Sequence, residues 1–307
     1  MFVDTHTHFY DEWLLPDAEQ AIQRALEAGV GKMIQADVDS RERPAMWEIG
    51  MRHPGVLFQM LGLYPGSVNE NWQDELEQVF SIVSGRGYAF PSANNRADAT
   101  GEAYPSPNSR QRIRSEATQG VWGIRPPVSE TIFAANAPAF VAIGEIGLDY
   151  HEGKEFAAQQ KEVLRLQFEL AARLDLPVNI HLRDAWEDFF TVLEDCRHLH
   201  LRGNLHCFTA SYEVFERANR HADFLVGIGG VVTFKNASLA KTLERIPPER
   251  ILLETDAPYL APVPWRGRRN ESAYLPLIAD KVARIKGLSL EQIETITTHN
   301  AETLFGI

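Results

Sequence analysis

Cysteine is scarce in this sequence, and the features that would direct a chain to a membrane are missing. Two cysteines, Cys196 and Cys207, occur among 307 residues, too few for a disulfide framework and typical of a reducing compartment. No apolar run approaches the roughly 20 residues that a membrane-spanning helix needs. The first residues, Met1-Phe2-Val3-Asp4, have neither the basic nor the apolar segment of an export signal. We therefore expect a cytoplasmic protein without a membrane partner.

Positive charge is also in short supply. The chain has 30 Lys and Arg against 42 Asp and Glu, which gives a formal net charge of −12 at pH 7. Proteins that hold nucleic acid by charge alone carry basic stripes, because phosphate neutralisation supplies most of the affinity. If this chain acts on nucleic acid, divalent cations and a local arginine cluster must supply the attraction. Otherwise the acidic balance serves solubility.

Short apolar runs alternate with longer amphipathic stretches along most of the chain. One such stretch, 157–174, places Val163, Leu166 and Leu170 on one helical face; another helix is expected at 17–27. The candidate strands are 2–5, 32–36, 56–61, 140–145, 177–181, 203–206, 224–228 and 251–255. Eight strands, each followed by a helix, favour a (β/α)₈ TIM barrel over a doubly wound sheet.

One segment, 85–138, breaks this rhythm because it is rich in Gly, Pro, Asn and Ser. It falls between the third helix and the fourth strand, so we expect a single barrel domain over 1–307 with an insertion there. The insertion carries several arginines, among them Arg96, Arg110 and Arg125. It is either an excursion without catalytic purpose, an oligomer contact or a basic arm, and the oligomeric state stays open.

The first strand ends in two histidines. In a strand, residues two apart point to the same face, so His6 and His8 can reach one metal ion. A lone His-x-His pair is weak evidence, because histidines also occur as ordinary buried residues. The pair gains weight only if other ligands converge on the same place.

Ionisable residues follow four more predicted strands. Glu145 ends the fourth strand, His181 the fifth and His206 the sixth, and Asp256 follows the eighth. The residues of a TIM-barrel active site converge at these carboxyl ends. A strand emerging into solvent would explain any one of them, but not the whole set. Four histidines and two carboxylates form a nitrogen and oxygen set suited to Zn²⁺, Mn²⁺ or Mg²⁺.

This set predicts a two-metal centre. Ions roughly 3.5–4 Å apart can activate one water and stabilise both oxygens of a displacement. We assign His6, His8 and Asp256 to one ion and His181 and His206 to the other. Glu145 would bridge the two ions. Asp256 is also placed to accept a proton from the attacking water, so Glu145 and Asp256 are the predicted catalytic residues.

Arginines lie in two loops near the same mouth. Arg266 and Arg269 belong to the loop after the eighth strand, and Arg183 follows the fifth. Guanidinium groups bind phosphate oxygens in bidentate fashion, so these three are the predicted substrate-binding residues. Each could instead be a solvated surface arginine.

These stretches together resemble the TatD family of metal-dependent deoxyribonucleases, within the amidohydrolase-type TIM barrels. The matching stretches are DTHTH at 4–8, GEIGLDY at 144–150, IHLRDA at 180–185, LHCFT at 205–209, LETDAPYLAP at 253–262, RGRRNE at 266–271 and NAETLFG at 300–306. The resemblance implies the same six ligands that the strand ends indicate. It also implies a cytoplasmic 3′–5′ exonuclease that acts on DNA, single-stranded or at 3′ ends, in DNA degradation or repair.

The sequence departs from the family at one position near the mouth. Where the family reads Gly-x-His-Pro, this chain has Gly62-Leu63-Tyr64-Pro65, and a tyrosine cannot match a histidine's acid–base range near neutrality. Two other functions therefore stay open. One is a metal-dependent amide or ester hydrolase, such as an aminoacyl-tRNA deacylase, and the other is a non-catalytic metal-binding interaction module.

Overall fold

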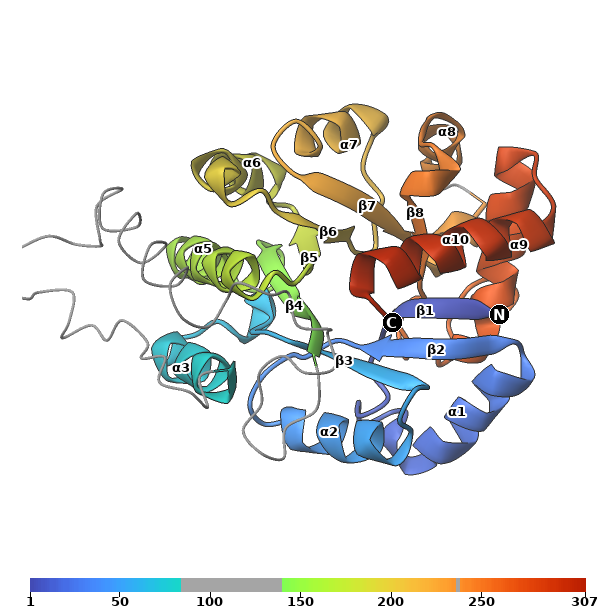
Figure 1. Ribbon diagram of the computed structural model, residues 1–307, viewed down its shortest axis with the longest axis horizontal. Coiled ribbons are helices and arrows are strands. Elements are labelled where there is room, and N and C mark those ends of the chain that lie inside the picture. Colours follow the sequence, from blue (N-terminus) through green and yellow to red (C-terminus); the bar gives the residue numbers. More distant parts are fainter. Residues whose placement is uncertain (84–139, 236–237) are drawn as a thin grey trace, which may run out of the picture. The chain divides into compact units, whose positions relative to one another are not determined.

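The computed structural model describes residues 1–83, 140–235 and 238–307. In this part of the chain, eight parallel strands follow one another around a sheet in the order β1 to β8, with helices outside them (Figure 1). The strands are β1 Phe2–Thr7, β2 Val30–Gln35, β3 Leu57–Leu61, β4 Phe140–Asp149, β5 Val178–Arg183, β6 Arg202–Leu205, β7 Asp223–Ile228 and β8 Ile251–Leu253. The predicted (β/α)₈ TIM barrel is confirmed.

The helices follow the strands as the alternating pattern predicts. They are α1 Ala18–Glu27, α2 Arg43–Arg52, α3 Trp72–Val83, α5 Ala157–Leu174, α6 Trp186–Asp195, α7 Tyr212–Ala218, α8 Leu239–Arg245, α9 Leu275–Lys286 and α10 Leu290–Phe305. The helix predicted at 157–174 has the bounds of α5, and its buried face includes Val163, Leu166 and Leu170. None of the helices described is both long and apolar enough to cross a bilayer.

The fourth strand runs further than the sequence indicates. It was expected to end at Glu145, but β4 continues to Asp149 because residues 146–149 pair with residues 180–183 of β5. The pairing is irregular between Ile143 and Ile146. Glu145 therefore lies inside the strand at a local irregularity, a feature that often re-aims a side chain beside an active site.

The barrel closes between its first and last strands through a few specific contacts. Residues Thr7 and Ala257 form an isolated parallel bridge. The amide of Asp256 donates to the carbonyl of His6 at 2.9 Å, and the amide of His8 donates to the carbonyl of Ala257 at 2.8 Å. Buried Asp4 adds a side-chain link by accepting from the Thr255 amide and hydroxyl at 2.9 and 2.6 Å. Three candidate ligands thus lie at this closure.

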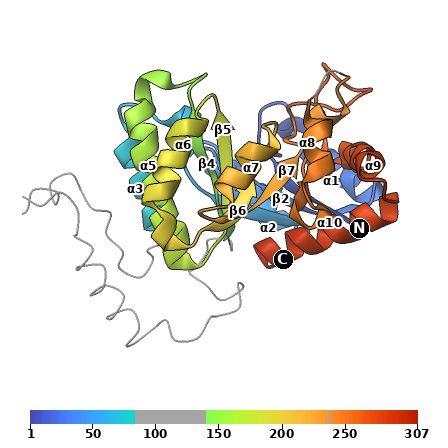
Figure 2. The same ribbon diagram turned by 90° about the horizontal axis from the view of Figure 1, so that it is seen from above.

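Helix α10 runs beside β1 (Figure 1), and the second view shows it next to the N-terminus, where β1 begins (Figure 2). Its residues Ala301, Leu304 and Phe305 join a buried apolar cluster that also includes strand residues such as Val3 and Leu252. The helix begins at a capping box formed by Ser289 and Gln292, which satisfies free amides of the first turn. The helix therefore covers the sheet on the side where the strands begin.

The residues up to Leu76 and from Phe140 onward form one compact unit. The segment 85–138, for which we predict an insertion, lies outside the described residues. The prediction of a single domain with an insertion therefore stays a prediction.

Replacing Phe305 by Ala should destabilise the fold strongly. The side chain is 2% exposed, so its removal loses apolar burial and leaves a cavity, which costs about 3–5 kcal/mol. Leu290→Ala in the same helix is the control, because Leu290 is 41% exposed and its truncation should cost under about 0.5 kcal/mol. Urea denaturation measures both values, and equal midpoints for the two variants would contradict this account of the core.

Candidate metal centre

The two histidines of the first strand point to one place. His6 and His8 are almost completely buried, and their Nε2 atoms lie 3.1 Å apart. The Tyr10 hydroxyl donates to the Ala36 carbonyl, so it accepts from His8 Nδ1, which lies 2.8 Å away. His6 Nδ1 lies 2.9 Å from Asn179 Oδ1, which can only accept. With a proton on each Nδ1, both neutral rings direct an Nε2 lone pair toward the other ring, an arrangement that fits a shared cation.

Glu145 faces histidines on two sides. Its Oε2 lies 3.3 Å from His6 Nε2, and its Oε1 lies 2.8 Å from His181 Nδ1 and 3.9 Å from His206 Nε2. The carboxylate is buried, and it presents one oxygen to each part of the cluster. This is the arrangement that a bridging carboxylate requires.

Asp256 completes the cluster from the loop after β8. Its Oδ1 lies 3.5 Å from His8 Nε2 and 3.8 Å from both His6 Nε2 and His206 Nε2. The residue has φ of 57°, in the left-handed region that non-glycine residues rarely adopt. The rings of His6 and His206 stack with centroids 3.5 Å apart. The structure thus brings all six predicted ligands together.

The sets that could hold one ion differ slightly from the predicted division. Ligand atoms of His6, His8 and Asp256 lie within 4.8 Å of one another, as do those of His6, Glu145 and His206. The first set is the one expected for the first ion. His181 reaches the cluster through Glu145, and its assignment to the second ion stays a prediction.

Two fully buried carboxylates contact the remaining histidines on the side away from the cluster. His181 Nε2 lies 2.9 Å from Asp149 Oδ2, and His206 Nδ1 lies 2.9 Å from Glu254 Oε1. Glu254 also accepts from the Cys207 amide at 2.5 Å. Such partners fix the orientation and basicity of metal-binding imidazoles. Sequence reasoning missed them, although both belong to stretches quoted above for the family resemblance.

The charges around the cluster shift its pKa values. Burial raises the pKa of Glu145, but the neighbouring His6 and His181 outweigh it and hold that pKa well below its usual range. Burial opposes protonation of His181 and His206, but their carboxylate partners outweigh it and raise the pKa to about 9 and about 10. Burial lowers the pKa of His6. Without ions, protons on His181 and His206 therefore balance part of the negative charge.

Tyr64 lies at the mouth beside His181. The two rings meet edge to face with centroids 5.0 Å apart, and the Tyr64 hydroxyl donates to Asp149 Oδ2 at 3.4 Å. Burial, and then the charge of Glu145, raises the tyrosine pKa far above its ordinary value. Tyr64 is thus a neutral hydrogen-bond donor, and the departure from the family pattern changes a residue of the site itself.

A buried ion pair holds the backbone of the central carboxylate. The Asp37 amide donates to the Gly144 carbonyl at 3.3 Å, and the Glu145 amide donates to the Asp37 carbonyl at 3.0 Å. The Asp37 side chain accepts from Arg43 Nε at 2.7 Å and from the Gly62 amide at 3.1 Å. Both partners of the pair are less than 5% exposed. Asp37 and Arg43 thus help to place Glu145.

The predicted substrate-binding arginines have protein partners. Arg269 pairs with Asp17 and Glu271 and donates to the Trp13 carbonyl at 2.9 Å. Arg183 Nη1 lies 3.2 Å from Glu152 Oε1. The guanidinium of Arg266 lies 4.5 Å from the ring centroid of Phe234. Their substrate role stays a prediction, and Arg269 is the most heavily engaged of the three.

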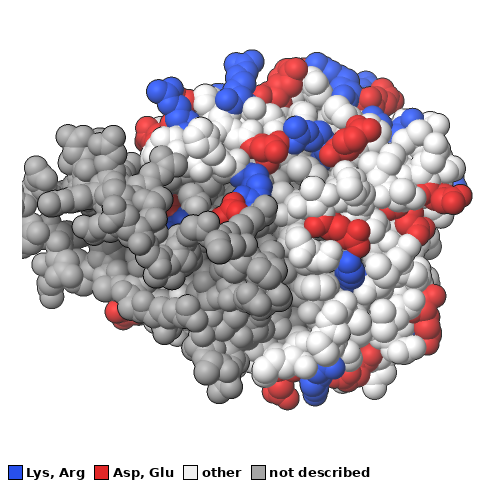
Figure 3. Space-filling view, viewed as in Figure 1, with Lys and Arg blue, Asp and Glu red and all other residues white. Residues whose placement is uncertain are grey.

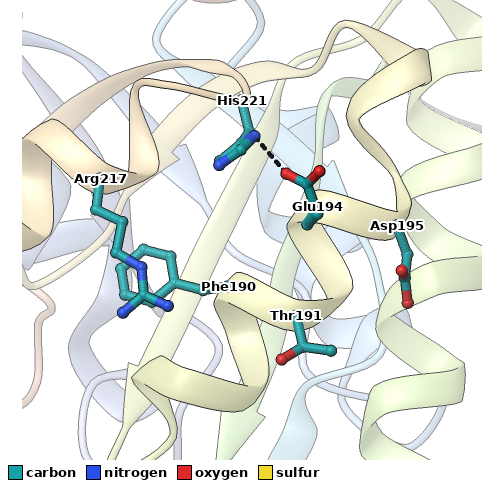
Figure 4. A pocket seen from close by; sticks show the side chains of 6 residues that line it. All are labelled: Phe190, Thr191, Glu194, Asp195, Arg217 and His221. Carbon is teal, nitrogen blue, oxygen red and sulfur yellow. Dashed lines mark ion pairs between the residues drawn. The ribbon is translucent and has the colours of Figure 1, made fainter.

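A surface pocket of about 330 Å³ lies elsewhere on the barrel (Figure 4). It is lined by Phe190, Thr191, Glu194, Asp195, Arg217 and His221. Figure 4 shows His221 pairing with Glu194, at 2.8 Å, and the Arg217 guanidinium lies 3.9 Å from the Phe190 ring centroid. None of the candidate ligands lines this pocket, and Glu194, Arg217 and His221 already pair with other charged groups. We therefore assign the chemistry to the buried cluster.

Comparison with known proteins decides the family. A family model described as TatD related DNase matches residues 3–306. The chain belongs to this family. The match confirms the resemblance found in the sequence. The matched range runs from β1 to the end of α10 and includes every candidate ligand.

Two curated relatives and one solved structure are similar to this chain. YabD of Bacillus subtilis, named an uncharacterized metal-dependent hydrolase, is 46% identical over 168 residues, 54% of this chain and 66% of YabD. The 3′-5′ ssDNA/RNA exonuclease TatD of Klebsiella pneumoniae is 39% identical over 189 residues, 59% of this chain and 72% of that protein. The TatD homologue YJJV of Escherichia coli K12 has the same fold, with a TM-score of 0.74 at 23% identity, covering 100% of this chain and 98% of YJJV.

Affinity for divalent metal should rise with pH. His181 and His206, with pKa values of about 9 and about 10, carry protons near pH 7 that a metal ion must displace. Each displaced proton increases the apparent association constant about tenfold per pH unit below those values. Because the folded pKa values exceed the ordinary histidine value, the same protons stabilise the metal-free fold below about pH 6.5, and this is lost as the pH rises through about 9 to 10. Chelator competition with Zn²⁺ at pH 6, 7 and 8 measures how steeply the metal affinity changes with pH. An affinity independent of pH would contradict this charge balance.

Arg43→Met should destabilise the protein by about 3–5 kcal/mol at pH 8, because it leaves the Asp37 carboxylate buried without its partner. Burial already raises the pKa of Asp37 to about 6 despite Arg43, and loss of the guanidinium raises it further. Because this folded pKa lies above the unfolded one, protonation relieves the cost, and the loss should be smaller at pH 5.

Urea denaturation at both pH values tests this expectation, with Asp37→Asn combined with Arg43→Met as the matched control. The double variant should recover part of the stability and lose the pH dependence. A single variant that is equally destabilised at pH 5 and pH 8 would show that the carboxylate is not left charged and buried.

Proposed function

We propose that this chain is a metal-dependent phosphodiester hydrolase, a TatD-like deoxyribonuclease that removes nucleotides from the 3′ end of single-stranded DNA. The observation that carries the proposal is the convergence of four imidazoles on Glu145 and Asp256 at the mouth of a barrel whose family is TatD related DNase. A relative in that family is named a 3′-5′ ssDNA/RNA exonuclease.

Two divalent ions, Mg²⁺, Mn²⁺ or Zn²⁺, would fit this cluster. His6, His8 and Asp256 would hold one ion, His181 and His206 the other, and Glu145 would lie between them. The four carboxylates of Glu145, Asp149, Glu254 and Asp256 carry a formal charge of −4, which two divalent ions would neutralise. When bound, such ions supply Lewis acidity toward a phosphate oxygen and lower the pKa of a water.

The side chains of this chain would do the remaining work. Burial opposes ionisation of Asp256, but its hydrogen bond with His8 and the charge of His206 hold its pKa below the usual range. Its carboxylate is therefore ionised near neutrality, as a proton acceptor must be. The Asp149 carboxylate keeps His181 oriented toward Glu145. The neutral Tyr64 hydroxyl, which donates to Asp149 here, could donate to a substrate oxygen instead without adding charge.

The surface charge accords with local rather than global attraction of the substrate. On the face shown in Figure 3, basic and acidic side chains are interspersed. At a net charge of −12, the positive field for phosphate would come from the bound ions and from nearby arginines such as Arg266 and Arg183. The predicted cytoplasmic location and the role in DNA degradation or repair stay predictions.

A second candidate is a metal-dependent amide or ester hydrolase, such as an aminoacyl-tRNA deacylase. It is favoured by Tyr64, which stands beside His181 where the family pattern has a histidine. The metal cluster would be the same, and only the bond that is cleaved would differ.

Glu145→Gln should abolish hydrolysis of end-labelled single-stranded DNA, with kcat reduced about 100-fold or more, because the amide loses the charge shared between both ligand sets. It should also reduce bound metal, which elemental analysis measures independently of activity. Glu194→Gln, in the surface pocket of Figure 4, is the control and should retain metal and activity.

Retained turnover in Glu145→Gln would remove the bridging role of this residue. Metal-loaded wild-type protein that cleaves no DNA with Mg²⁺, Mn²⁺ or Zn²⁺, yet hydrolyses an aminoacyl ester, would establish the second candidate instead.

A further inference from the structure

Two exposed aromatic side chains stand beside the metal cluster. Trp13, in the loop after β1, is 57% exposed, and Tyr259, in the loop after β8, is 44% exposed. Their ring centroids lie 6.0 Å apart, and the Tyr259 ring lies 6.2 Å from the ring of His8. We call Trp13 and Tyr259 the aromatic platform. Large aromatic rings left open to solvent so close to a buried polar centre indicate a contact surface for a ligand.

Hydrogen bonds from neighbouring polar side chains hold the platform in place. Asp11 accepts from the Tyr259 hydroxyl at 2.6 Å and from the Trp13 amide at 2.8 Å. Arg269 donates to the Trp13 carbonyl at 2.9 Å, and Asn270 donates to the Tyr259 carbonyl at 2.6 Å. The two loops are therefore ordered before a ligand arrives, which lowers the entropic cost of binding.

We propose that the aromatic platform stacks an unpaired base of the nucleic-acid strand, on the nucleotide next to the bond that is cleaved. This inference rests on the proposed function and specifies what the site recognises. Aromatic side chains bind single strands because every base has a face that can stack, whatever its sequence. The 6.2 Å between Tyr259 and His8 puts the platform within one nucleotide of the cluster.

The charges at the platform favour a base over a phosphate. The Asp11 carboxylate is bonded to both aromatic residues and would repel a phosphate placed there. The nearest arginine, Arg269, is occupied by Asp17 and Glu271. A neutral, flat base is not repelled by Asp11 and does not need a free guanidinium group. Arg269 acts in this proposal as a positioning residue for Trp13, through its hydrogen bond to the Trp13 carbonyl.

The platform would also favour single-stranded over double-stranded nucleic acid. Bases of a duplex are stacked and paired with one another, and moving one onto the protein costs free energy that a single strand does not require. The preference for a single strand would therefore come from Trp13 and Tyr259. The metal cluster would contact only the phosphodiester.

The test uses the metal-loaded protein, Trp13→Ala, Trp13→Phe and the control Met51→Ala, an equally exposed residue at 59% on α2. The substrates are a labelled thymidine oligonucleotide and the same oligonucleotide with an abasic site at each of its last two nucleotides. Trp13→Ala should raise KM about tenfold on the intact strand with little change in kcat. Trp13→Phe should restore most of the loss. On the abasic strand, Trp13→Ala and the wild-type protein should have equal KM values.

Fluorescence anisotropy gives a readout that does not depend on turnover, with metal-loaded protein and labelled strands whose phosphorothioate linkages resist cleavage. Trp13→Ala should bind the intact strand about tenfold more weakly than wild type and the abasic strand equally. An unchanged KM and affinity for the intact strand would overturn the proposal, as would equal losses on both strands. If the wild-type protein cleaves no oligonucleotide, the proposed function fails, and the anisotropy comparison still decides the platform.

Discussion

The carboxylate of Glu145 lies buried among four histidines, and the rest of the site follows from the need to balance its charge. An ionised group away from water is costly unless charges and hydrogen bonds compensate it. Its two oxygens therefore face His6 on one side and His181 on the other. The same requirement extends outward, because the histidines in turn contact Asp149, Glu254, Asn179 and Tyr10.

The sequence allowed the barrel and its candidate ligands to be predicted because both depend on short-range patterns. Apolar runs that reach an ionisable residue lie toward the carboxyl ends of strands, and parallel strands bring those ends together. The bounds of α5 were predictable from its periodicity. The end of β4 was not, because its last residues are held by pairing with β5 rather than by their own propensities.

The outer partners of the histidines were beyond such reasoning. Asn179 and His6 lie 173 positions apart in the chain, and Arg269 and Asp17 lie 252 apart. Whether a polar side chain turns toward a ligand, toward another charge or toward solvent is decided by tertiary packing. Arg269 illustrates the point, since its residue type fits a phosphate as well as the two carboxylates it contacts. The segment 85–138 lies outside the described residues.

Two glycines make room beside candidate ligands of the cluster. A Cβ atom at Gly227 would lie 2.0 Å from Glu254 Oε2, so only a residue without a side chain leaves room for that buried carboxylate. At Gly147, φ is 152° and a Cβ atom would lie 1.9 Å from the His181 carbonyl oxygen, which makes glycine the residue that fits there too. Two residues without side chains thus shape the surroundings of His206 and His181.

The closure between β1 and β8 has a consequence for how the protein is made. His6 and His8 are synthesised some 250 residues before Asp256, whose amide donates to the His6 carbonyl. A nascent chain can hold most of the ligands, but it cannot assemble the cluster until its last strand meets its first. The complete cluster would therefore form in one step, only after β8 has been synthesised and the barrel closes.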